Sequence, residues 1–206
     1  MSEHELVVLA HGMGRTPASM WMLARTLRAR GYRVLNWGYN SYTRPLHELG
    51  ALMARDVAAA AGNAATVHFV GHSLGTVITR WVLKHAPPAR LGRVVMLAPP
   101  NRGAARADRV ARFGAWLLPP LVDLCTHDGA AARALAAPAG VEVGIIAGAA
   151  DRTVRVAETH LDGAAGHVLV PGGHTFIMLR PNVHRLVCAF LDTGTFPANR
   201  PHGRAA

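Results

Sequence analysis

A serine, an aspartate and a histidine stand in this chain where short, small-residue loops follow strand-like runs. The segment Gly71–Gly75, which reads Gly-His-Ser-Leu-Gly, separates a strand-like run (65–70) from a helix-like run (76–85). Gly-x-Ser-x-Gly between a strand and a helix predicts a nucleophile elbow, a sharp turn that presents a serine oxygen. Glycine suits this turn because it tolerates crowding and unusual backbone angles. We therefore expect Ser73 to be a nucleophile.

A serine hydroxyl needs a base to take its proton, and the base needs an acid to orient it. In hydrolases with this elbow, the chain order is Ser, then Asp or Glu, then His. Asp151 follows the strand-like run 141–147 across a Gly-Ala-Ala loop. His174 follows the last such run, 167–171, and comes directly after the loop Pro171-Gly172-Gly173. We predict a catalytic triad of Ser73, Asp151 and His174.

Other carboxylates compete for the role of the acid. Asp123 and Asp128 lie in a long connection between two strand-like runs and remain alternatives. Asp151 has a second possible role as the N-cap of the helix-like run 154–160, since aspartate is a good capping residue. Catalysis and capping are compatible, so both roles remain open for Asp151.

The chain has twelve histidines, so position must decide among them. His72 lies inside the elbow and is expected to point away from the serine oxygen. His160 and His184 lie in predicted helices and are expected to be exposed. His167 begins the last strand-like run instead of following it. His174 is the histidine that the strand order favours.

The tetrahedral intermediate of acyl transfer needs N–H donors for its oxyanion. The amide of Leu74, directly after the nucleophile, is one donor by geometry. The loop after the first strand-like run reads His11-Gly12-Met13-Gly14, and its glycines allow the backbone to approach a substrate closely. We assign the second donor to the backbone N–H of Met13. A plain strand-to-helix turn is the alternative interpretation of this loop.

Four apolar side chains are tentative candidates for the wall of a substrate pocket: Met13, Trp21, Trp116 and Leu117. Packing in the core is the alternative role for them. Two of the four, Trp116 and Leu117, lie in the long connection 99–140. That connection is interpreted either as a short cap or pocket wall over the site or as an extra core helix.

The remaining sequence predicts the elements that must position these residues. Six short β-rich runs alternate with helix-like stretches, which is typical of an α/β protein with a parallel sheet and helices on both faces. Ligands bind such sheets at the carboxyl ends of the strands. The predicted strands are 5–10, 32–37, 65–70, 93–98, 141–147 and 167–171, and the predicted helices are 18–30, 45–61, 76–85, 154–160 and 181–191.

Length and composition favour one domain at 1–193, with a mobile tail at 194–206. The formal charge of +10 comes almost entirely from arginines spread along the chain, so it indicates no nucleic-acid partner. Cys125 and Cys188 stand in no metal or redox spacing, and no disulfide is expected. We find no signal peptide and no apolar run that could span a membrane, so a cytoplasmic location and no stable membrane insertion are expected.

Together these motifs resemble the α/β-hydrolase superfamily, and within it the small bacterial lipases and esterases. The segment Pro100–Gly103, which reads Pro-Asn-Arg-Gly, adds to the resemblance because such lipases carry a similar segment after their sixth strand. The resemblance spans residues 5 to 192. It implies a six-stranded, mostly parallel sheet flanked by helices on both faces, without the family's first two antiparallel strands, with a short cap insertion and no large lid.

The resemblance also implies an activity. A serine esterase or lipase would cleave a small-molecule ester or a lipid through an acyl-enzyme on Ser73, with no cofactor and no metal. Three enzymatic alternatives use the same triad: thioesterase, acyltransferase and phospholipase. A catalytically inert hydrolase-fold protein that binds a ligand is the non-enzymatic alternative. The sequence does not decide the oligomeric state.

Overall fold

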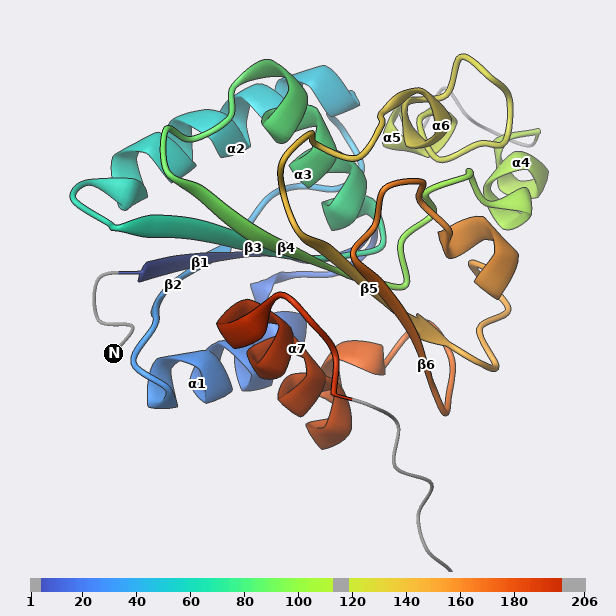
Figure 1. Cartoon of the computed structure of the whole chain (residues 1–206). Helices are drawn as coiled ribbons and strands as arrows, with labels where there is room; N and C mark the ends of the chain where they lie inside the picture. The colour runs from blue at the N-terminus through green and yellow to red at the C-terminus, as the bar shows by residue number, and fades with distance from the viewer. Residues whose placement is uncertain (1–4, 113–118, 198–206) are drawn as a thin grey trace, which may run out of the picture.

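The computed structural model describes residues 5–112 and 119–197. Six strands form one sheet in the order β2-β1-β3-β4-β5-β6, and all neighbouring pairs are parallel (Figure 1). The predicted parallel sheet is confirmed. The strands are β1 (Glu5–Ala10), β2 (Arg33–Trp37), β3 (Thr66–His72), β4 (Leu91–Leu97), β5 (Val143–Gly148) and β6 (Gly166–Val170).

Helices cover both faces of the sheet, as parallel strands require for their crossover connections. One face carries α1 (Trp21–Ala29) and α7 (Pro181–Thr193), and the other carries α2 (Leu46–Ala61) and α3 (Leu74–His85) (Figure 1). Local signals set the bounds of α7: Pro181 occupies its first turn, and Gly194 ends it with a left-handed φ of 76°. Because all six strands are parallel, the loops that follow them lie at one edge of the sheet. The predicted site residues belong to these loops.

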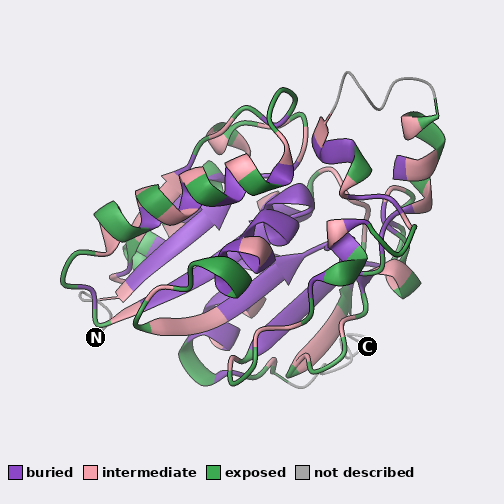
Figure 2. Ribbon diagram, turned by 90° about the horizontal axis from the view of Figure 1, so that it is seen from above, coloured by how far each residue is buried: buried purple, intermediate pink, exposed green. Residues whose placement is uncertain are grey.

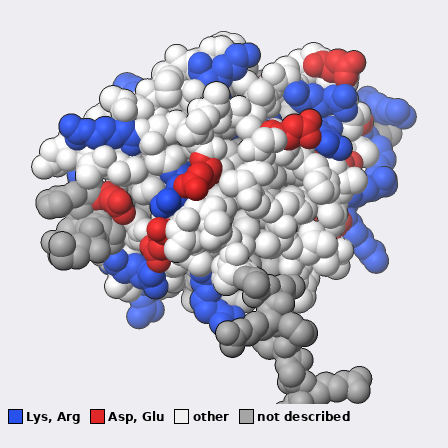
Figure 3. Space-filling view, in the orientation of Figure 1, with Lys and Arg blue, Asp and Glu red and all other residues white. Residues whose placement is uncertain are grey.

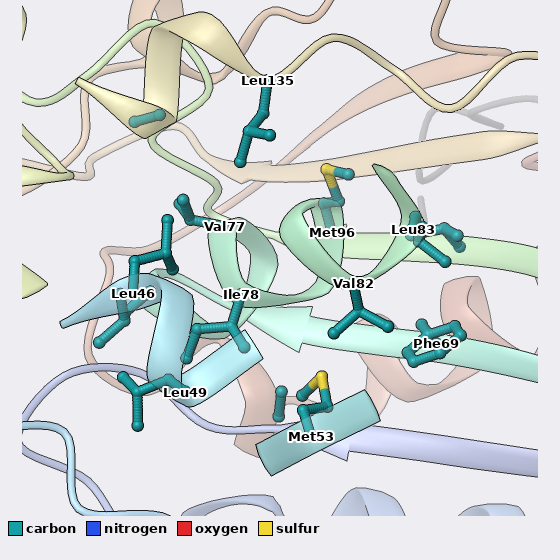
Figure 4. Close-up of a cluster of buried hydrophobic side chains, with 14 of the residues drawn as sticks. Leu46, Leu49, Met53, Phe69, Val77, Ile78, Val82, Leu83, Met96 and Leu135 are labelled. Atoms are coloured by element: carbon teal, nitrogen blue, oxygen red, sulfur yellow. The ribbon is translucent and has the colours of Figure 1, made fainter. Parts of the chain in front are cut away.

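The strands at the centre of the sheet are buried, α3 is buried almost all round, and α1 and α2 each present an exposed outer face (Figure 2). The larger of two apolar clusters lies between the sheet and the helices α2 and α3. There Met53 of α2 and Ile78 and Val82 of α3 meet Phe69 of β3 (Figure 4). Burying such side chains is worth roughly 1.5–3 kcal/mol each, and this packing fixes α3 directly behind the elbow.

The second apolar cluster packs α1 and α7 on the opposite face. Cys188 belongs to it, whereas Cys125 belongs to the cluster beside α2 and α3. Both cysteines are buried free thiols. The sheet lies between their two clusters, which agrees with the expectation of no disulfide.

The described part of the long connection between β4 and β5 contains the short helices α4 (Ala105–Ala111), α5 (Pro119–Val122) and α6 (Ala131–Ala134). Buried side chains of this insertion join the α2–α3 cluster. Arg80 of α3, only 1% exposed, donates hydrogen bonds to the carbonyls of Leu135 and Ala132, the latter over 2.8 Å. Burial lowers the pKa of Arg80 to about 10. The insertion is therefore fastened to the helix that begins at the elbow.

One predicted helix differs in the structure. The run 154–160 forms only a 3-10 turn, η3 (Val156–Thr159). The Glu158 side chain accepts a hydrogen bond from the Arg155 amide over 2.7 Å, and a box of this kind closes the turn on itself. The short turn keeps the segment after β5 compact.

The first residues after α7 pack against the rest of the domain. Phe196 packs on Phe190, with ring centroids 4.8 Å apart, and lies against Gly144 and Gly166 of the last two strands. The predicted tail 194–206 therefore begins with packed residues, and positions 198–206 lie outside the described residues.

Charged side chains are dispersed over the molecule. On the face drawn in Figure 3, lysines and arginines are scattered among acidic and neutral residues. None of the helices in the described part of the chain has the length and apolar character needed to cross a membrane. Within 5–112 and 119–197, no three His, Cys, Asp or Glu side chains group in a way that could hold a metal ion.

Candidate active site

The elbow has the strained backbone that its sequence predicts. Ser73 stands between β3 and α3 with φ 51° and ψ −120°, a conformation that non-glycine residues rarely adopt. A side chain on Gly71 would lie 2.8 Å from the Thr76 amide nitrogen, and one on Gly75 would lie 2.3 Å from the Ala10 carbonyl oxygen. Glycine at both positions lets α3 pack against the ends of β1 and β3, which holds Ser73 in its strained turn.

Asp151 and His174 meet, although 23 residues separate them. The Nδ1 atom of His174 lies 2.8 Å from Oδ2 of Asp151, and the aspartate side chain is almost fully buried. The other carboxylate oxygen, Oδ1, accepts hydrogen bonds from the amides of Thr153 (2.8 Å) and Val154 (2.9 Å). Asp151 thus contacts His174 and also accepts the two amides that follow it, whereas the N-cap of η3 is Arg155, so the expected capping of the run 154–160 by Asp151 is wrong.

His72 connects the elbow to the loop that carries His174. Its Nε2 atom lies 3.1 Å from the main-chain oxygen of His174, so the N–H at this nitrogen donates to that carbonyl. The two rings lie 4.9 Å apart. Burial lowers the pKa of His72 well below its usual value, with a further lowering from the neighbouring His174. The ring is therefore neutral and fixed as a donor at Nε2.

The two predicted oxyanion donors flank Ser73. Leu74 is the first residue of α3, so its amide has no carbonyl partner within the helix. The loop with Met13 approaches from β1, and a side chain on Gly12 would lie 3.1 Å from Cβ of Ser73. Among the described residues, neither the Met13 nor the Leu74 amide has a hydrogen-bond acceptor. Both amides thus have no acceptor in the described chain, and their role as oxyanion donors stays a prediction.

One contact of the predicted triad is not formed. Within the described chain, Ser73 Oγ and His174 Nε2 share no hydrogen bond, although His72, the residue before Ser73, contacts His174 through its main-chain oxygen and its ring. Catalytic hydrogen bonds are often long or poorly aligned without substrate and tighten in the complex. The structure therefore brings Asp151 and His174 together and joins His174 to the elbow through His72, and the serine–histidine contact stays a prediction.

The alternative acids have other environments. Asp128 forms an ion pair with Arg133 over 3.0 Å. Asp123 is partly buried in the insertion, and burial raises its pKa. In the part of the chain that the structure describes, neither carboxylate contacts His174. Of the three carboxylates considered for the acid, Asp151 is the one that contacts His174.

The remaining histidines differ in part from expectation. His160 is exposed, as predicted, and it stacks on His167, the second residue of β6. The expectation that His184 is exposed is wrong. His184 of α7 is only 6% exposed, and its side chain faces α1. Its Nε2 atom lies 2.7 Å from the Met178 carbonyl oxygen, and its Nδ1 atom lies 3.1 Å from Oγ1 of Thr26 in α1.

Of the four predicted pocket residues, the structure describes Met13 and Trp21. Trp21 is 53% exposed and lines an open depression of about 370 Å³ with Pro17, Ala18 and Asn36. Met13 is half-buried and packs against the α2–α3 cluster. Trp116 and Leu117 lie outside the described residues.

The segment Pro100–Gly103 after β4 has a positional role that its motif alone did not reveal. The side-chain amide of Asn101, which is buried, donates to the Thr159 carbonyl over 2.8 Å, and the Arg102 amide donates to the Glu158 carbonyl over 2.9 Å. These bonds fasten the turn η3, which follows Asp151, to the end of β4. The segment that follows Asp151 is thus hydrogen-bonded to the segment that follows β4.

The sheet order, the flanking helices and the elbow define an α/β-hydrolase fold, and solved structures agree. The chain is similar to the mature form of the Bacillus licheniformis lipase BlEst2, with a TM-score of 0.71 and 16% identity over 92% of this chain and 91% of that chain. It is also similar to a carboxylesterase structure from the thaumarchaeon Nitrososphaera gargenis, with a TM-score of 0.62 and 16% identity over 93% and 91% of the two chains.

A third neighbour is a putative thioesterase from Silicibacter sp. TM1040, with a TM-score of 0.65 and 19% identity over 89% of this chain and 73% of that chain. No protein-family model and no curated protein matches the sequence. Identities at this level establish the fold, and the activity must be inferred from the site itself.

Proposed function

We propose that this chain is a serine hydrolase that cleaves carboxylic esters through an acyl-enzyme on Ser73. The observation that carries the proposal is the 2.8 Å bond between His174 Nδ1 and Asp151 Oδ2, in a pair that His72 joins to the strand-to-helix turn where Ser73 has φ 51°. A histidine bound in this way has its Nε2 lone pair free for the serine proton. Strain at Ser73 is of the kind that accumulates at functional sites.

In the proposed mechanism, Ser73 Oγ attacks the ester carbonyl while its proton moves to Nε2 of His174. Asp151 keeps the Nδ1 proton in place and stabilises the imidazolium that forms. The amides of Met13 and Leu74 donate to the oxyanion of the tetrahedral intermediate. His174 then returns the proton to the departing alkoxide, and the acyl-enzyme remains. A water molecule attacks it, again with His174 as base, and releases the acid and Ser73.

Small esters of short or medium chain are the substrates that we favour. The lipase and carboxylesterase neighbours support ester chemistry on this fold. The half-buried Met13, at the proposed oxyanion loop, offers an apolar wall for an acyl group. Trp21 lines an open depression, and none of Ser73, Asp151 and His174 is among its described lining residues. Its place in an acyl pocket therefore stays a prediction, like that of Trp116 and Leu117.

Thioester hydrolysis is the second candidate. The fold of the putative thioesterase from Silicibacter supports it, and the formal charge of +10 would favour binding of phosphate-bearing thioesters such as those of coenzyme A. Both reactions would use the same three residues, so only the substrate separates them.

The test compares purified protein on p-nitrophenyl esters of increasing acyl length and on acyl-coenzyme A thioesters of the same lengths. The proposal expects the highest kcat/KM on an ester of short or medium chain, abolished by Ser73→Ala. A higher kcat/KM on the matched thioester would select the second candidate. No turnover of either series, with a folded protein, would refute the proposed enzyme function and favour the ligand-binding alternative.

A further inference from the structure

The loop that follows β2 holds both ends of the proposed oxyanion loop. The hydroxyl of Tyr39 donates a hydrogen bond to the main-chain carbonyl of His11 over 2.6 Å. Two residues later, Ser41 Oγ accepts a hydrogen bond from the amide of Gly14 over 2.9 Å. Between these two fixed points lies Met13, the proposed second oxyanion donor. Tyr39 and Ser41 reach this loop because β2 pairs with β1 in the sheet.

Tyr39 is itself held in place by stacking. Its ring lies on the His11 imidazole, with centroids 4.1 Å apart and planes 8° from parallel, and on its other side Trp37 lies 4.6 Å away. Trp37 donates from Nε1 to Asp56 of α2 over 3.0 Å. Burial raises the pKa of the Tyr39 hydroxyl, so this group keeps its proton and remains a donor at any working pH. A rigid stack thus connects α2 to the His11 carbonyl.

Ser41 acts on the opposite end of the loop. The side chain of Ser41 is buried, and it fixes the amide of Gly14, which has a left-handed φ of 68°. The turn itself is closed by the Arg15 amide, which donates to the Gly12 carbonyl over 3.2 Å. With the peptides on both sides fixed and its own carbonyl bonded to Arg15, the Gly12–Met13 peptide, which carries the Met13 N–H, has little freedom to rotate.

We propose that Tyr39 and Ser41 are positioning residues that orient the Met13 amide toward the oxyanion. This inference rests on the proposed function, because it concerns the transition state of that reaction. Neither residue touches the reacting atoms, so each acts through the backbone of residues 11–14. Oxyanion donors are effective when they are preorganised, and a misplacement of about 1 Å can cost about a hundredfold in rate.

The test uses Tyr39→Phe, Ser41→Ala and the double variant. Each single change keeps most of the side-chain volume and removes one hydrogen bond to the loop. Two changes elsewhere are matched controls. Tyr32→Phe removes a tyrosine hydroxyl that donates to Asp192 over 2.9 Å, and Ser19→Ala removes a serine hydroxyl that donates to the Thr16 carbonyl over 2.8 Å.

The measurements are kcat and KM on the best ester, the Ki of a trifluoromethyl ketone with the same acyl group, and the melting temperature. The ketone forms a tetrahedral adduct with a charged oxygen, so its Ki reports oxyanion binding. We expect kcat to fall about 10- to 100-fold in each single variant, KM to change less than about threefold, and Ki to rise in parallel with the loss of kcat/KM. The control variants should leave kcat and Ki near wild type.

Wild-type kcat and Ki in both Tyr39→Phe and Ser41→Ala would overturn the proposal, as would equal losses in the control variants. If Tyr39→Phe melts too early to assay, Ser41→Ala decides by the same criteria. A wild-type protein that hydrolyses no ester and binds no ketone would instead refute the proposed function. A failure of that function is thus distinguishable from a failure of the positioning role.

Discussion

Substituting Asp151 by asparagine changes the tautomer of His174 while leaving its surroundings in place. The Oδ1 atom of Asp151 accepts two amide hydrogen bonds, from Thr153 and Val154. In Asp151→Asn, the single amide oxygen must stay there, because the NH2 group cannot accept. The NH2 group then replaces Oδ2, 2.8 Å from His174 Nδ1. Because NH2 only donates, Nδ1 must become the acceptor, and the ring proton moves to Nε2.

A proton on Nε2 blocks the lone pair that must receive the serine proton. We therefore expect kcat to fall about 10³- to 10⁴-fold, equivalent to about 4–5.5 kcal/mol of transition-state stabilisation. The two hydrogen bonds from the amides survive, so the melting temperature should stay near wild type. Steady-state ester hydrolysis at pH 7.5 gives kcat, and a thermal melt checks the fold.

Asp108→Asn is the matched control. Like Asp151, Asp108 accepts two hydrogen bonds, in this case from the amide and the hydroxyl of Thr126. It differs from Asp151 because it lies in the insertion. It should leave kcat within about threefold of wild type. A loss of less than about tenfold in Asp151→Asn would refute the tautomer reasoning and reopen the search for the orienting acid.

Three further changes probe the packing and the charge around the site. Gly75→Ala would place a methyl group 2.3 Å from the Ala10 carbonyl oxygen, so we expect a loss of about 1–3 kcal/mol in urea unfolding and a lower kcat, whereas Gly129→Ala, with its nearest atom at 3.5 Å, should change neither. His72→Ala removes the donor to the His174 carbonyl and should lower kcat at least about tenfold, and an unchanged kcat would show that other contacts hold that loop. Burial, with a smaller effect of the neighbouring arginine, lowers the pKa of His68 to about 4, so its neutral form is favoured in the fold. The stability it confers is therefore full above about pH 6.5 and falls by up to about 3 kcal/mol toward pH 4, a slope that His68→Asn should flatten in urea titrations at several pH values.

The strands and the positions of the candidate site residues after them could be predicted from the sequence because both depend on local patterns. Short β-branched runs bounded by glycine identify the strands, and in a parallel sheet the loops after them share one edge. That edge is where the structure places Ser73, Asp151 and His174. The strained φ of Ser73 is possible because Gly71 and Gly75 carry no side chain. The neighbouring backbone can therefore approach closely on both sides of the turn.

The structure differs where a local pattern was too short or incompletely used. The seven residues 154–160 yield only a 3-10 turn, because the turn begins after its N-cap Arg155 and the backbone is already extended at His160. The burial of His184 had a signal in the sequence, since it lies four residues before Cys188 and seven before Leu191 on the apolar side of α7. The helical spacing would have placed it inside.

The contacts of Tyr39 and Ser41 with the first loop were beyond prediction from local pattern. These residues lie 28 and 27 positions from their partners, and only the pairing of β2 with β1 brings the two loops together. The role of His72 is similar. Its position in the elbow was known, but its bond to the His174 carbonyl depends on a loop 102 residues away.

The central claim is that His174 activates Ser73. The most direct measurement is the rate and stoichiometry of labelling by a fluorophosphonate serine probe, read by intact mass, for wild type, Ser73→Ala and His174→Ala. The account predicts one label per wild-type chain on Ser73, none on Ser73→Ala, and labelling slowed by orders of magnitude in His174→Ala. Labelling of His174→Ala at the wild-type rate, or no labelling of a folded wild-type protein, would contradict it.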